Sequence, residues 1–354
     1  MSKFFSKKYK NLKPYVPGEQ PKERKYIKLN TNESPFPPSK YAIEFATHAL
    51  KNLHLYSDPE STTLTLSTAS SLGVSAENVI MTNGSDEVLN FAFMAYCDME
   101  NPAIFPDISY GFYRVFAEIN GVPYKEIPLK EDFSIDIDDY INEKGTVFIA
   151  NPNAPTGLLL TLDKIEKLLS SNSERIVVID EAYIDFGGES AVKLLSKYDN
   201  LIVTRTFSKS RSMAGARLGF GVASKEIISD LKAIKYSTNP YNVNSATAAA
   251  GEGSLADEDY FNKNCKKIIE NREWTEKELK NLGFSLTNSK ANFIFAKNDK
   301  ISGKDLYLRL KDKGILVRHF DKERIKEYNR ITIGSIEEMK AFISAVKVIL
   351  EELK

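Results

Sequence analysis

The chain has 354 residues, 48 basic and 48 acidic side chains, 3 histidines and 2 cysteines. This length allows two domains, and the balanced charge argues against nucleic acid or an anionic membrane as a partner. Two cysteines, Cys97 and Cys265, are too few for a disulfide framework, so we expect a cytoplasmic protein. The three histidines, His48, His54 and His319, do not have the spacing of metal ligands, so we expect no metal site.

The predicted elements change character near residue 254. Before this point, apolar runs alternate with helix-like stretches. The apolar runs predict strands at 78–82, 102–105, 146–151, 175–180 and 201–207. The stretches between them predict helices at 85–98, 111–120, 161–171 and 190–198. This alternation predicts an α/β domain with a mainly parallel sheet flanked by helices. The later segments predict a smaller α+β domain, with helices at 258–283 and 337–354 and strands at 292–296, 314–320 and 330–334. No run approaches the roughly 18 apolar residues of a membrane span.

Two of the loops that follow these strands combine glycine or proline with polar side chains, at the sheet edge where α/β proteins bind ligands. Gly84 allows close approach of a ligand, and the free N–H groups of Ser85 and Asp86 at a helix start suit an anion. A capped strand-to-helix turn explains the same residues. The stiff loop 151–157, which contains two prolines and a glycine, is either a turn or the wall of a site.

The next two strands lead into charged residues. Asp180 ends an apolar strand and needs a cation or a hydrogen bond, although an acidic helix start explains it as well. Lys209 and Arg217 bring positive charge into a region of small residues and require an anion. The common nucleotide motifs G-x-x-x-x-G-K-[ST] and G-x-G-x-x-G do not occur. An amine, a carboxylate, a helix start and an arginine together suit a phosphorylated aldehyde with a protonatable ring nitrogen, as in pyridoxal 5′-phosphate.

At these residues the chain resembles the fold-type I aminotransferases, and most closely their histidinol-phosphate aminotransferase branch. The resemblance covers nearly the whole chain and lies in the motifs PYVPGE, LNTNESP, LYSDPES, NGSDE, ISYGFY, NPNAPTG, VVIDEAYIDF, RTFSKSRSMAGARLGF, GILVR and RITIGS. It implies a large cofactor-binding domain formed by residues 43–253. It also implies a small domain formed by residues 1–42 and 254–354.

The resemblance implies a catalytic role for three residues. Lys209 matches the lysine that forms a Schiff base with the cofactor and then moves a proton, and we expect burial, Arg211 and Arg217 to lower its pKa. Asp180 matches the carboxylate that keeps the pyridine nitrogen protonated. Tyr183 matches the phenol that bonds the cofactor's 3-oxygen.

Further matches concern the cofactor's phosphate and ring. The resemblance implies a phosphate site formed by Ser85, Asp86, Thr206, Ser208 and Arg217. Tyr110 matches the aromatic residue that stacks on the pyridine ring, although an aromatic core residue explains it as well. Tyr56 matches the tyrosine that reaches the cofactor of the neighbouring subunit, so a homodimer with shared sites is implied.

Three residues match positions that bind the substrate in the family. Arg330 matches the arginine that binds the substrate carboxylate in the family, or the phosphate of histidinol phosphate in this branch. Arg318 and Tyr15 are expected to assist it, and a structural or solvated role is the alternative for all three.

Two positions depart from the family pattern. The asparagine that precedes Pro-Thr-Gly in the family and contacts the cofactor's 3-oxygen is Ala154 here, and we assign its contact to Asn153. Arg211 replaces an uncharged residue of the branch.

The resulting hypothesis is a ping-pong transfer of the amino group between L-glutamate and imidazole acetol phosphate, which gives L-histidinol phosphate in histidine biosynthesis. An aminotransferase for aromatic or other amino acids, or a decarboxylase of the threonine-phosphate type, shares most of these motifs. A non-enzymatic regulator on this fold usually carries a helix-turn-helix domain, and the segment before Leu29 is too short for one.

Overall fold

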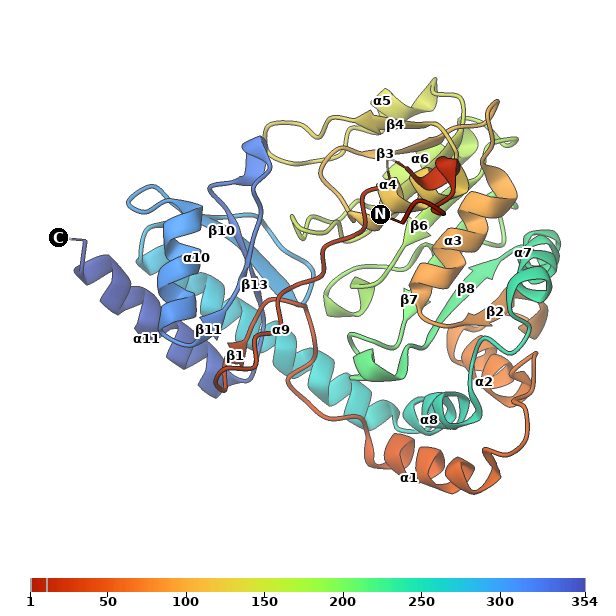
Figure 1. Ribbon diagram of the computed structural model, residues 1–354, viewed down its shortest axis with the longest axis horizontal. Coiled ribbons are helices and arrows are strands. Elements are labelled where there is room, and N and C mark those ends of the chain that lie inside the picture. The colour runs from red at the N-terminus through yellow and green to blue at the C-terminus, as the bar shows by residue number, and fades with distance from the viewer. Residues whose placement is uncertain (1, 11, 354) are drawn as a thin grey trace.

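The computed structural model describes residues 2–10 and 12–353. Its elements form a large part, from α1 to α8, and a small part made of β1 and the elements from α9 to α11 (Figure 1). Within the described ranges we find no helix that combines the length and the hydrophobicity needed to cross a bilayer. The domain boundaries expected at residues 43 and 254 stay a prediction.

A seven-stranded sheet forms the centre of the large part, in the order β2-β8-β7-β6-β5-β3-β4. The strands are β2 (Val79–Thr82), β3 (Ala103–Pro106), β4 (Tyr124–Ile127), β5 (Thr146–Ala150), β6 (Val177–Asp180), β7 (Leu201–Thr206) and β8 (Gly219–Ala223). Only β8 among them runs antiparallel to its two neighbours. The other pairs are parallel, which confirms the predicted mainly parallel sheet.

Helices cover both faces of this sheet. They are α1 (Lys40–Ala49), α2 (Thr62–Leu72), α3 (Ser85–Tyr96), α4 (Phe112–Asn120), α5 (Asp138–Ile141), α6 (Leu162–Ser170), α7 (Lys225–Thr238) and α8 (Ser245–Leu255). Successive residues of one strand belong to opposite cores: Val177 and Ile179 pack in one cluster, and Val178 in another. This burial on both faces explains why the strands are continuously apolar.

Two strands and five helices of the large part, α1, α2, α5, α7 and α8, were not among the expected elements, and one expected helix-like stretch differs. β4 is an edge strand with exposed polar residues, and β8 contains two glycines, so neither has the apolar pattern of the other strands. The segment 190–198 forms only a short 3-10 helix.

Short 3-10 helices also connect the main elements. They are η1 (Lys7–Tyr9), η2 (Leu50–Asn52), η3 (Ala76–Asn78), η4 (Ile184–Phe186), η5 (Ala191–Leu194), η6 (Ala214–Ala216) and η7 (Glu323–Ile325).

The small part contains an antiparallel sheet in the order β12-β13-β10-β9 and three helices. Its elements are α9 (Glu258–Asn281), β9 (Phe284–Leu286), β10 (Phe293–Asn298), α10 (Gly303–Asp312), β11 (Ile315–Leu316), β12 (Arg318–His319), β13 (Asn329–Thr332) and α11 (Ile336–Glu351). β1 (Ile27–Lys28) pairs in parallel with β11, which attaches the N-terminal segment to this part. The long helix α9 extends from α8 along the small part (Figure 1).

Candidate active site

Residues from the ends of several strands meet in one cavity of about 270 Å³. The predicted site residues that line it are Ser85, Asp86, Tyr110, Asp180, Tyr183, Thr206, Ser208, Lys209 and Arg217. They come from the ends of β2, β6 and β7 and the loops after β3 and η6. The parallel sheet brings them together because its parallel strands all end at the same edge.

Asp180 is a buried carboxylate at the end of β6. The hydroxyls of Tyr113 and Thr204 donate hydrogen bonds to its two oxygens, over 3.2 Å and 3.1 Å. Burial, with a smaller contribution from the negative charge of Asp86, raises its pKa to about 6. Asp180 forms no ion pair with the residues that the structure describes, and a protonated ring nitrogen in the cavity would provide a positive partner.

The amine of Lys209 is buried beside Tyr183. Its Nζ lies 3.4 Å from the carbonyl oxygen of Thr31 and 5.8 Å from the ring centre of Tyr183. Burial first, and then the positive charge of Arg330, lower its pKa to about 8, with a smaller effect from Arg217. The amine is therefore closer to a neutral nucleophile than an exposed lysine.

The expected influence of Arg211 on this amine is wrong. Its guanidinium donates to the carbonyl oxygen of Ser254 over 2.7 Å and pairs with Glu258 over 2.6 Å. It also lies 4.2 Å from the ring centre of Phe261. These partners belong to α8 and α9, so the side chain is held at the helix junction and adds no charge to the cavity.

An anion site forms where α3 begins. Gly84, with a φ of 78°, precedes the helix, and the first N–H groups of an α-helix, here those of Ser85 and Asp86, precede the intrahelical acceptors. A Cβ atom at Gly84 would lie 2.6 Å from Nη2 of Arg217, so the glycine leaves room for the guanidinium. The helix start, Arg217 and the hydroxyls of Thr206 and Ser208 can together surround a phosphate.

Asp86 contributes its side chain as well as its backbone. Its two carboxylate oxygens accept hydrogen bonds from the hydroxyl of Tyr110 over 2.7 Å and from Nη2 of Arg217 over 3.0 Å. One residue therefore orients the ring expected to stack on the cofactor and the arginine expected to bind its phosphate. Sequence reasoning assigned only the backbone of Asp86 to the site.

Tyr183 is oriented by a residue that sequence reasoning missed. Nδ2 of Asn32 donates to the phenol oxygen over 3.0 Å, and the ring of Phe293 packs edge-on at 5.1 Å. Burial raises the pKa of the phenol, although the charge of Arg330 acts in the opposite direction. Asn32 belongs to the motif LNTNESP, which is part of the family resemblance. The motif could therefore have pointed to Asn32, although it did not indicate which of its residues contacts Tyr183.

A second cavity of about 520 Å³ shares Tyr110, Tyr183 and Lys209 with the first. Arg330 borders it, and its guanidinium lies between the rings of Phe293 and Phe320, at 5.4 Å and 5.8 Å from their centres. Nη2 of this arginine donates to a backbone carbonyl over 3.1 Å, while its buried Nε has no partner among the described residues.

Arg318 and Tyr15 also border the second cavity. Arg318 donates to the carbonyl oxygens of Val16 and Pro17 over 3.2 Å and 3.3 Å, so it holds the N-terminal segment at the cavity. The ring of Tyr15 packs 4.4 Å from that of Phe112. All three residues predicted for the substrate therefore lie in one cavity next to Lys209.

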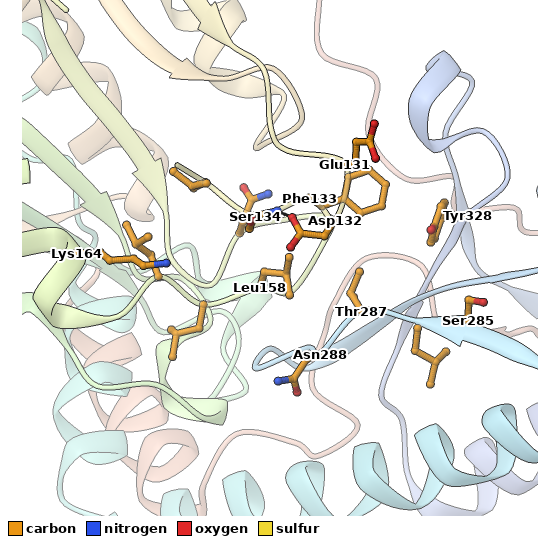
Figure 2. A pocket seen from close by; sticks show the side chains of 15 residues that line it. Glu131, Asp132, Phe133, Ser134, Leu158, Lys164, Ser285, Thr287, Asn288 and Tyr328 are labelled. Carbon is orange, nitrogen blue, oxygen red and sulfur yellow. Dashed lines mark hydrogen bonds between the residues drawn. The ribbon is translucent and has the colours of Figure 1, made fainter. Parts of the chain in front are cut away.

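Asn153 does not reach the first cavity. Its side chain lies on the other side of its loop, at a separate cavity of about 420 Å³, whereas Ala154 lines the first cavity. Figure 2 shows this separate cavity, where Phe133 and Leu158 of the large part face Tyr328 of the small part. Successive residues of the loop face opposite sides, so Asn153 cannot take over the contact assigned to it.

Tyr56 lies at the surface of the single chain. Its side chain is 83% exposed and stacks on Tyr241, with the ring centres 4.5 Å apart. None of the three cavities described above is lined by it. A contact with a cofactor would therefore require a second chain.

The residues that are present fit a phosphorylated aldehyde with a ring nitrogen. Lys209 offers an amine of lowered pKa, Asp180 a buried carboxylate in need of a cation, and Arg217 with the start of α3 an anion site. These groups surround one cavity, and the second cavity continues from the same amine toward Arg330.

Comparisons with known proteins agree with this chemistry. The family model described as Aminotransferase class I and II matches residues 24–346. The histidinol-phosphate aminotransferase of Brachyspira hyodysenteriae is 49% identical over 353 residues, which cover 99% of this chain and 100% of the relative. The protein of the same name from Clostridium botulinum is 46% identical over 354 residues, which cover 100% of both chains.

Solved structures show the same fold. The histidinol-phosphate aminotransferase from Sinorhizobium meliloti, in complex with pyridoxal-5'-phosphate, is similar with a TM-score of 0.91 at 23% identity, over 100% of this chain and 99% of that one. The histidinol-phosphate aminotransferase from Clostridium acetobutylicum has a TM-score of 0.85 at 26% identity, over 92% and 99% of the two chains. Given these matches along nearly its whole length, the chain belongs to the class I and II aminotransferases.

Proposed function

We propose that this aminotransferase binds pyridoxal 5′-phosphate and interconverts L-histidinol phosphate and 2-oxoglutarate with imidazole acetol phosphate and L-glutamate, as a step of histidine biosynthesis. The observation that carries the proposal is that cationic groups lie on both sides of Lys209. Arg217 borders the first cavity, whereas Arg318 and Arg330 border the second. A phosphorylated cofactor and a phosphorylated substrate require two such sites.

The residues around the first cavity would hold the cofactor. Ser85, Thr206, Ser208 and Arg217 would bind its phosphate, and Tyr110 would stack on its ring. Tyr183 would donate to its 3-oxygen, and Asp180 would keep a proton on its ring nitrogen. When bound, the cofactor supplies an aldehyde for amines and a protonated ring that accepts electrons.

Lys209 would hold the cofactor covalently until a substrate amine displaces it. Its free amine would then move the proton at the substrate's α-carbon. With a pKa lowered to about 8, about a tenth of this amine is neutral at pH 7, far more than for an ordinary lysine, and a general base requires the neutral form. The groups that lower it, burial and Arg330, belong to the cavity itself, so loss of Arg330 would affect proton transfer as well as binding.

The second cavity would hold the substrate's anionic group. The buried Nε of Arg330 has no partner among the described residues, and the guanidinium lies near two aromatic rings and donates to a backbone carbonyl, which restricts its position. Arg318 and Tyr15 would complete this site from the side of the N-terminal segment.

A homodimer in the cytoplasm is part of the proposal. Many large apolar side chains are exposed around α1 and the loop that follows it, namely Tyr41, Ile43, Phe45, Leu50, Leu53, Leu55 and Tyr56. An apolar surface of this kind favours burial against another chain. In such a dimer Tyr56 would contribute to the partner's cofactor site.

Turnover with a panel of acceptors tests the substrate. With L-glutamate as donor, we expect imidazole acetol phosphate to have a higher kcat/KM than phenylpyruvate and other keto acids. Preference for an aromatic keto acid would replace the substrate assignment and leave the family unchanged. Release of carbon dioxide from an amino-acid phosphate, without amino transfer from glutamate, would instead favour the decarboxylase.

A further inference from the structure

We propose that Asn153 is a positioning residue for Tyr110, and that it acts by fixing the segment 107–110 that carries this ring. The proposal rests on the proposed function, because there Tyr110 stacks on the cofactor. Asn153 itself touches neither the cofactor cavity nor the substrate cavity.

The amide of Asn153 makes three hydrogen bonds, which use both its N–H donors and its oxygen. Nδ2 donates to the carbonyl oxygen of Ile108 over 3.0 Å and to the hydroxyl of Thr156 over 3.1 Å. Oδ1 accepts from the hydroxyl of Ser109 over 2.8 Å. The residue is 2% exposed, so these bonds are shielded from water and costly to leave unmade. Two of the three partners immediately precede Tyr110 in the chain.

The same segment is also held by the small part of the molecule. Nη1 of Arg324 pairs with the carboxylate of Asp107 over 3.2 Å, and Nζ of Lys322 donates to the carbonyl oxygen of Asp107. At its far end the hydroxyl of Tyr110 donates to Asp86 over 2.7 Å. Within the large part, the backbone of Asp107 donates to Ile127 and its carboxylate accepts from the N–H of Leu129, each over 2.9 Å. Loss of the Asn153 amide would therefore release Ile108 and Ser109, which lie between Asp107 and Tyr110, and let the ring move away from its stacking position.

Asn151 provides a matched control in the same loop. It is 0% exposed, and its amide exchanges two hydrogen bonds with the backbone of Leu160, over 3.0 Å and 2.7 Å. It makes no side-chain bond to the segment 107–110. If Asn153 only stabilised the loop, Asn151→Ala and Asn153→Ala would weaken cofactor binding by similar factors.

The test measures the dissociation constant of pyridoxal 5′-phosphate and the circular dichroism of the bound cofactor. We expect Asn153→Ala to weaken binding about tenfold and to alter the dichroism, whereas Asn151→Ala stays within about twofold. In a Tyr110→Ala background, Asn153→Ala should have no further effect, since it acts through the missing ring. If Asn153→Ala fails to fold, Ser109→Ala should weaken binding about threefold by the same route.

Additive effects of Tyr110→Ala and Asn153→Ala, or equal effects of the Asn151 and Asn153 variants, would overturn the proposal and leave the proposed function intact. If Tyr110→Ala changed neither cofactor binding nor dichroism, the stacking role would be wrong, and the positioning role with it. A wild-type protein that binds no pyridoxal 5′-phosphate would overturn the proposed function as well.

Discussion

At the end of β6, the carboxylate of Asp180 is buried next to Asp86, and two hydroxyls donate to it. Its pKa of about 6 lies above the ordinary value of 3.8, so the folded protein binds this proton more tightly than the unfolded chain does. The contribution of Asp180 to the free energy of unfolding is therefore fully present below about pH 4, and it is lost as the pH rises toward 6. Under the proposed function, this cost in stability keeps a carboxylate available for the ring nitrogen of the cofactor.

Replacement of Asp180 by asparagine should remove this loss of stability, because the asparagine side chain does not ionise. In the cofactor-free protein, we expect Asp180→Asn to be more stable than the wild type by roughly 3 kcal/mol above about pH 6, with the difference declining toward zero near pH 4. Amino transfer should be lost. Urea unfolding at several pH values measures the difference, and a difference that does not vary with pH would contradict the explanation.

Glu181 is the comparison for this experiment. It is also buried, and burial raises its pKa from 4.5 to about 7, but it does not line the cofactor cavity. Glu181→Gln should therefore show the same kind of pH dependence, between about pH 4.5 and 7, while amino transfer is retained.

Single residues of the site were predictable from sequence where a motif fixed their place at a strand end. Asp180, Tyr183 and Lys209 all line the predicted cavity. Asn153 was misplaced because an irregular loop has no periodicity that tells which residue faces the site. Tyr113 was missed because its bond to Asp180 joins residues 67 positions apart, and the sequence contains no sign of that contact.

At the scale of elements, β8 is the part of the sheet that most constrains the anion site. It lies antiparallel between β2 and β7, and its first residue, Gly219, pairs with Thr82 and Thr206. A Cβ atom at Gly219 would lie 2.3 Å from the backbone nitrogen of Ser85, at the start of α3. The close contact between β8 and the helix start therefore depends on a glycine.

Gly219→Ala should move the start of α3 away from β8. We expect a loss of about 1–3 kcal/mol in the free energy of unfolding and weaker binding of the cofactor phosphate. The control is Gly215→Ala, since a Cβ atom there meets nothing within 4 Å and stability should change by no more than about 0.5 kcal/mol. Denaturant unfolding and cofactor titration measure both effects, and equal results for the two variants would contradict the packing argument.

The elements themselves were predictable to the extent that their faces are apolar. The strands buried on both faces, such as β5 and β6, have unbroken apolar runs and were found. β4 and β8 were not, because an exposed edge and a glycine-rich strand lack this pattern. The mainly parallel sheet and the family are confirmed, whereas the antiparallel position of β8 depends on contacts far apart in the chain.

At the scale of the whole molecule, a shared site can be tested by mixing two inactive or impaired chains. In a homodimer, a Lys209→Ala chain supplies an intact Tyr56, and a Tyr56→Ala chain supplies an intact Lys209. Random reassociation makes half of the dimers mixed, each with one complete site, so about a quarter of the wild-type activity should return. Activity no higher than the average of the two separate variants would contradict a site shared between chains.

The N-terminal segment, residues 12–26, contains no helix or strand, yet it borders the second cavity, which is proposed to bind the substrate. Side chains hold it in place: Arg318 binds Val16 and Pro17, and Tyr307 and Lys311 bind Glu19. Since no backbone ladder ties it to a sheet, this wall can open at a much lower free energy than the core strands. We therefore expect this side of the second cavity to unfold as a separate unit, so that its amide protons exchange with solvent while those of β5 and β6 stay protected.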